Sequence, residues 1–165
     1  MQESDAQNSN SDSIVSLTKE GINFIEAGEP EKAIRSLSNA LKKDSIFWES
    51  YYLKAIAFTY NEQAKEAVND FQKSISIHLS GSAKFPDTLI TNSLLKSRPF
   101  GQKGERRSLD ENPSLQLWQK YLIQGVWEFI VSNGKNHTDA CELWLNANYL
   151  ESLQSISSLN KSYCK

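Results

Sequence analysis

The sequence predicts an all-α fold in which antiparallel helix hairpins stack as a short solenoid. Apolar residues recur at helical spacing from Ile14 onward, and glycine and proline mark short turns between the helical stretches. One pattern also returns with a period of about 34 residues, which is typical of arrays built from pairs of helices. Together these observations favour a helical repeat protein.

Composition limits the classes of protein to consider. The chain has 165 residues, of which 39% are hydrophobic and 23% charged, with a formal net charge of −2. These fractions are those of a soluble globular domain, and the small net charge provides no field to attract nucleic acid. No apolar run approaches the roughly 18 residues that cross a bilayer, and the polar N-terminus is unlike a signal peptide. We therefore expect a cytoplasmic or nuclear protein without a membrane span.

The first hairpin is predicted to follow a disordered tail. Residues 1–12 are mostly Gln, Asn, Ser and Asp and lack periodic apolar residues, which predicts disorder. The helical pattern then runs to Ala27, with Gly28 just past its end and Pro30 in the first turn of the next helix. A link that short favours two antiparallel helices.

A second hairpin repeats the first, so that residues 13–78 are predicted to hold both. The corresponding positions are small, aromatic or aliphatic in the same order in both copies. The pairs are Leu17 and Tyr51, Gly21 and Ala55, Phe24 and Phe58, Ala33 and Ala67, Leu37 and Phe71, and Ala40 and Ser74. Small residues let the two helices of a hairpin approach closely, and the large residues fill the space between them.

This pattern resembles the tetratricopeptide repeat (TPR) family. The resemblance implies a TPR-like solenoid in which the first helix of each hairpin lines a concave, partly aromatic groove that binds a protein or peptide. The groove residues would then be Ile22, Ile25, Tyr52, Ile56 and Tyr60. An apolar groove of this kind accepts any matching helix, so a second interpretation stays open: the insert or the C-terminal helix of the chain fills it.

Residues 79–112 break the period and are predicted to form an irregular insert with a short helix over 88–96. Residues 113–157 are predicted to form a degenerate third hairpin and a capping helix. Ala140, Trp144 and Ala147 repeat the spacing of the second helices, but Glu128 stands where the earlier copies have an aromatic residue. We expect residues 149–156 to continue the last helix over the end of the stack, and residues 158–165 to be a tail.

The sequence offers no constellation for catalysis, and we expect no enzyme, no cofactor and no metal site. It lacks a phosphate-binding glycine loop and a nucleophile elbow. Cys141 and Cys164 are predicted to be free thiols, because two cysteines without a signal peptide are typical of a reducing compartment.

The expected function is that of a non-enzymatic adaptor, a scaffold that binds a partner protein. A carboxylate clamp for the C-terminal tail of a chaperone is not expected, because the clamp positions of the family hold Thr18, Ile22 and Leu53, which offer one hydroxyl in all. Two alternatives stay open. The protein could be a dedicated chaperone or assembly factor for one client, or a structural subunit that docks its apolar third hairpin on a neighbour.

Overall fold

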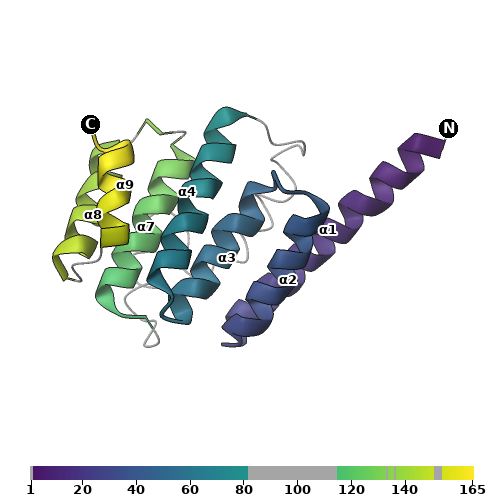
Figure 1. Cartoon of the computed structure of the whole chain (residues 1–165), viewed down its shortest axis with the longest axis horizontal. Coiled ribbons are helices and arrows are strands. Elements are labelled where there is room, and N and C mark those ends of the chain that lie inside the picture. The colour runs from purple at the N-terminus through teal and green to yellow at the C-terminus, as the bar shows by residue number, and fades with distance from the viewer. Residues whose placement is uncertain (1, 82–114, 133, 136, 151–153) are drawn as a thin grey trace.

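The computed structural model describes residues 2–81, 115–132, 134–135, 137–150 and 154–165 (Figure 1). All regular structure in these ranges is helical, which confirms the all-α prediction. The helices are α1 (Gln2–Glu26), α2 (Pro30–Lys43), α3 (Trp48–Tyr60), α4 (Ala64–Ser80), α7 (Leu117–Val131), α8 (His137–Leu150) and α9 (Gln154–Tyr163). The predicted insert lies outside the described residues from residue 82 onward, and so does its short helix.

The N-terminal segment differs from the sequence prediction, because α1 begins at Gln2 where a disordered tail over 1–12 was expected. Figure 1 shows that the first turns of α1 project beyond the other helices. The packed part of the helix is anchored by Ile14, which is buried. Once a helix is nucleated, each further residue adds one backbone hydrogen bond, so a helix can extend past its tertiary contacts.

The turn between α1 and α2 ends the first helix with a left-handed residue. Gly28 has φ +72°, and its N–H donates to Ile25 O at 3.0 Å. The next N–H, of Glu29, reaches back to Phe24 O at 2.8 Å. These two bonds satisfy carbonyls that the end of a helix otherwise leaves without partners.

The turn between α3 and α4, one sequence period later, has the same bonds at the equivalent positions. Glu62 has φ +57°, and its N–H donates to Thr59 O at 3.2 Å. The N–H of Gln63 donates to Phe58 O at 2.9 Å. The period of the sequence is therefore also a period of backbone geometry, although Glu62 stands at the position of Gly28.

Exchanging the residue types at these two equivalent positions should change stability in opposite directions. A left-handed conformation costs a residue with a Cβ about 1–2 kcal/mol, and glycine avoids that cost. We expect Glu62→Gly to raise the free energy of unfolding by about 0.5–1 kcal/mol and Gly28→Glu to lower it by about 1–2 kcal/mol. Urea denaturation followed by circular dichroism measures both. Destabilisation by Glu62→Gly would contradict the assigned turn.

Two glycines permit close helix contacts at the two ends of the molecule. A Cβ on Gly21 of α1 would lie 2.5 Å from Leu37 Cγ of α2. A Cβ on Gly125 of α7 would lie 2.6 Å from Trp144 Nε1 of α8. The first contact involves two residues that define the sequence repeat, and the second reproduces it in the segment where a degenerate third copy was expected.

A polar link between consecutive helices also recurs one sequence period later. In the first copy, Ser36 Oγ of α2 donates a hydrogen bond to the Glu20 carboxylate of α1. In the second copy, Lys54 Nζ of α3 lies 3.2 Å from Asp70 Oδ2 of α4. Lys54 Nζ also lies 5.5 Å from the centre of the Tyr51 ring, within the range of a cation–π contact. The link is kept while its chemistry changes from a hydrogen bond to an ion pair.

The burial of Asp70 should make stability depend on pH in a direction that is unusual for an aspartate. Burial raises the pKa of Asp70 above its ordinary value of 3.8, although Lys54 opposes the shift. The folded state therefore binds this proton more tightly than the unfolded state does. Stability from this group is full below pH 3.8 and falls as the pH rises through the folded-state pKa. We expect Asp70→Asn to flatten that fall when unfolding is measured from pH 3 to 7, and an unchanged profile would contradict the assignment.

The third pair of consecutive helices is tied to the second by a glutamine. Gln119 is buried in the first turn of α7, and its Nε2 donates to Thr59 O near the end of α3 at 2.9 Å. Its Oε1 accepts from the N–H of Gln116 at 2.8 Å, so the same side chain also caps α7. Helix α7 begins after Gln116, which is its N-cap residue.

The C-terminal segment differs most from the prediction. The last helix does not run on to residue 156, because α8 ends at Leu150 and α9 begins at Gln154. Residues 158–165 are not a tail: α9 extends to Tyr163 and packs against both α8 and α4. Gln72 Nε2 of α4 donates to Ser158 Oγ of α9 at 3.1 Å. The helix that was expected to cover the end of the stack lies against earlier helices instead.

The cysteines also differ from the prediction, because Cys141 and Cys164 form a disulfide rather than two free thiols. The bond joins α8 to the residue that follows α9.

Most buried apolar residues of the described chain form one core that runs from α1 to α9. No helix in the described ranges is both long enough and apolar enough to cross a bilayer.

Candidate partner-binding surface

The residues predicted to line the groove lie mostly in the core. Ile22, Ile25, Tyr52 and Ile56 expose 5%, 5%, 6% and 1% of their surface, and only Tyr60 is partly exposed. This differs from the open groove that the sequence suggested. Of the five residues, Tyr60 is the one that keeps part of its surface exposed, although it also packs against the core.

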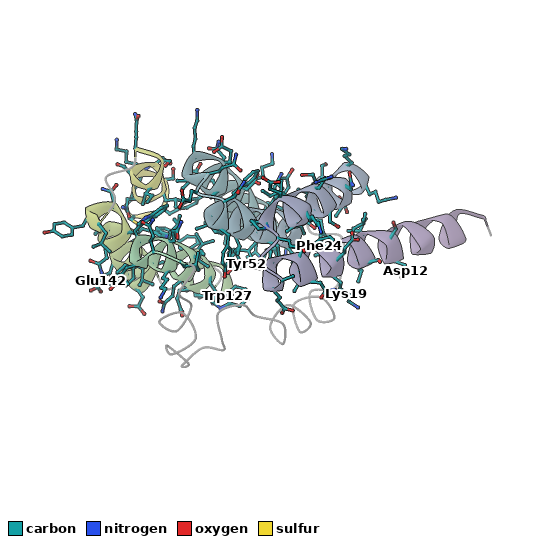
Figure 2. The ribbon with its side chains drawn as sticks, turned by 90° about the horizontal axis from the view of Figure 1, so that it is seen from below. Asp12, Lys19, Phe24, Tyr52, Trp127 and Glu142 are labelled. Carbon is teal, nitrogen blue, oxygen red and sulfur yellow. A yellow bond between two sulfur atoms is a disulfide. The ribbon has the colours of Figure 1, made fainter. Side chains whose placement is uncertain are left out.

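Helix α7 accounts for part of this burial. The ring of Tyr52 lies 5.6 Å from the ring of Trp127 on α7 and 5.8 Å from that of Phe71 on α4. Figure 2 shows Tyr52 and Trp127 close together. The aromatic residue expected to hold a partner is therefore packed between helices of its own chain.

The positions of a carboxylate clamp carry no accessible donor. Thr18, Ile22 and Leu53 are all buried. The single hydroxyl among them, Thr18 Oγ1, donates to Ile14 O at 2.8 Å and lies 2.9 Å from Ser50 Oγ. Because this hydroxyl is already hydrogen-bonded inside the protein, it is not available to a carboxylate.

Helix α8 carries an exposed apolar face that was not predicted from the sequence. Leu145 and Tyr149, one helical turn apart, expose 58% and 89% of their surface, and Leu150 is exposed beside them. Figure 2 places Glu142, three residues before Leu145, at the end of the molecule away from the N-terminus of α1. The sequence does contain a signal for this face: its apolar residues do not share the helical spacing of the packed residues Ala140, Trp144 and Ala147.

The described part of the chain holds no group of three or more His, Cys, Asp or Glu side chains arranged to bind a metal ion.

Comparison of the chain with protein-family models, with curated proteins and with solved structures finds no match.

Proposed function

We propose that the protein is a non-enzymatic adaptor of the tetratricopeptide type, with antiparallel helix hairpins that stack as a short solenoid and bind a partner protein. The observation that carries the proposal is the repeated turn: Gly28 and Glu62, one sequence period apart, have the same left-handed backbone and equivalent hydrogen bonds. The close approach at Gly21 and the recurring polar link between helices add independent support. Scaffolds with this period present surfaces to other proteins.

In this proposal the partner contacts the exposed edge of the face that α1 and α3 share. Ile22, Ile25, Tyr52 and Ile56 support that face from beneath, because they are buried. Tyr60, at the end of α3, is the anchor that the partner touches. A tyrosine suits this role, since it combines a large apolar area with a polar tip.

The second candidate function is that of a structural subunit of a larger complex, and the α8 face favours it. Terminal repeats of helical arrays usually have a polar outer face. Here Leu145 and Tyr149 make that face apolar, which is the pattern of a surface covered by another protein.

One experiment separates the two candidates. The wild-type chain, Tyr60→Ala and Tyr149→Ala are each used to capture proteins from the source cell, and the captured proteins are quantified by mass spectrometry. The adaptor proposal expects a partner that Tyr60→Ala loses and Tyr149→Ala retains, while the subunit candidate expects the reverse. If every partner is retained by both variants while their circular dichroism is unchanged, neither surface is the binding site.

A further inference from the structure

Helix α9 is a short helix whose far end is attached covalently to α8. It spans 10 residues, Gln154–Tyr163, and Cys164 directly after it forms the disulfide with Cys141. Its sequence, QSISSLNKSY, contains four serines and an asparagine, which are weaker helix formers than alanine or leucine. Isolated helices shorter than about 12–15 residues are marginal in water, so α9 depends on what it packs against.

The surface beneath α9 is apolar and is assembled from three helices. We call it the α9-binding surface and define it by Gln72 of α4, Phe129 of α7, and Cys141 and Trp144 of α8. The ring of Tyr163 lies 5.2 Å from that of Phe129 and 6.2 Å from that of Trp144. Gln72 donates a hydrogen bond to Ser158 of α9, as described above.

Three side chains of α9 face the core. Ile156 and Leu159 are fully buried, and Tyr163 packs against the same core. Their spacing of i, i+3 and i+7 is the one by which an amphipathic helix occupies an apolar surface of a protein partner. Helix α9 therefore packs against the rest of the chain in the way that a helix of a partner protein packs against an apolar surface.

We propose that the α9-binding surface is a docking site for an amphipathic helix of a partner protein, and that reduction of the Cys141–Cys164 disulfide makes it available. The occupant has the chemistry of α9: two aliphatic anchors one turn apart, followed by an aromatic residue, on an otherwise polar helix. With the disulfide closed, α9 is attached at both ends and excludes this competitor. With the disulfide open, α9 is attached at one end, and its local concentration over the surface falls.

The switching step requires a dithiol reductant. One thiolate of the reductant attacks a sulfur of the disulfide, and the S–S bond breaks as a mixed disulfide forms. The second thiol of the reductant then displaces the chain's sulfur. In total the reductant loses two electrons and two protons and becomes a disulfide, while Cys141 and Cys164 gain them as two thiols. Both cysteines are partly exposed, so the reductant can reach them.

The first measurement is amide hydrogen exchange on the full chain, oxidised and after treatment with dithiothreitol. The two cysteines are 23 residues apart. A disulfide that closes a loop of this size should favour the docked over the detached state of α9 by a factor of about a hundred. We expect exchange across α9 to accelerate about a hundredfold on reduction while α2 stays protected. Cys164→Ser should exchange at the reduced rate with or without the reductant. Equal protection of α9 in both states overturns the proposal, because the disulfide would then only reinforce a helix that stays in place.

The second measurement tests the surface itself with a fluorescein-labelled peptide of residues 154–163. Leu159→Asp removes an anchor of α9 in the full chain and leaves both cysteines intact. We expect this variant to bind the peptide at least about tenfold more tightly after reduction than before, by fluorescence anisotropy. A peptide with Asp in place of Ile156 should not bind. Absence of binding in both redox states overturns the proposal.

Protection of α2 from exchange reports whether each variant is folded. If Leu159→Asp unfolds, Tyr163→Ser takes its place, because Tyr163 is only partly buried, and the same two outcomes apply. These measurements need no natural partner. They can therefore fail while a Tyr60-dependent partner is captured, or succeed while none is, so this proposal and the proposed function are tested separately.

Discussion

Trp144→Ala is expected to lower the free energy of unfolding by about 3–5 kcal/mol, the range for removing a fully buried large aromatic residue. Trp144 exposes 0% of its surface and lies in the core that joins α7, α8 and α9. The centre of its ring lies 5.7 Å from that of Phe129 and 6.2 Å from that of Tyr163. Because these neighbours belong to different helices, the cavity left by alanine cannot close by the movement of one side chain.

The matched control is Leu145→Ala, at the next position of the same helix. Leu145 is exposed, so its removal should change stability by no more than about 0.5 kcal/mol. Urea denaturation followed by far-ultraviolet circular dichroism compares the two variants at equal concentration. If Trp144→Ala is as mild as Leu145→Ala, the packing of α8 against α7 is not as described.

Leu37→Ala is expected to lower the free energy of unfolding by about 2–5 kcal/mol. Leu37 is fully buried, and its side chain lies over Gly21, where a Cβ would approach within 2.5 Å of Leu37 Cγ. For the same reason Gly21→Ala should be destabilising by about 1–3 kcal/mol, since the added methyl group forces Leu37 to move.

The two changes should not be additive. In the Leu37→Ala background the methyl group of Gly21→Ala enters the space that the leucine has left, so its cost should largely vanish. The double-mutant cycle should give a coupling energy of about 1–3 kcal/mol, which chemical denaturation of the four proteins measures. Additive effects would mean that the two residues do not touch and that the repeat does not place them face to face.

The paired positions of the two copies could be predicted from the sequence because local chemistry dictates them. A residue with a small side chain has to stand where two helices approach closely, and Gly21 facing Leu37 shows why. A left-handed residue has to follow the first helix, and Gly28 indicates it. Glutamate does not indicate a left-handed conformation, so the turn at Glu62 can be expected only from its position one period after Gly28.

The candidate site could not be predicted in the same way. An apolar stripe indicates that one face of a helix is buried, but not what buries it. Tyr52 and Ile56 have the spacing of a binding face, yet Tyr52 packs against Trp127 of α7 and Ile56 belongs to the core. Which helix arrives at that face is decided by contacts between residues that are distant in sequence.

The disulfide and the position of α9 were missed for a related reason. Two cysteines 23 residues apart are compatible with free thiols or with a bond, and only the return of α9 onto α8 brings them together. The polar sequence of α9 resembles a tail, because just Ile156, Leu159 and Tyr163 mark its packed face. Its stability comes from tertiary contacts rather than from local preference.

The measurement that tests the register of the repeat most directly is nuclear magnetic resonance spectroscopy of the turns at Gly28 and Glu62. The structure predicts a positive φ at Glu62, from backbone chemical shifts and couplings, together with slow amide exchange at Gln63, as for the equivalent Glu29. An extended or right-handed Glu62, with a Gln63 amide that exchanges at the rate of an unfolded chain, would show that the second copy does not repeat the first. The proposed scaffold would then lose its main support.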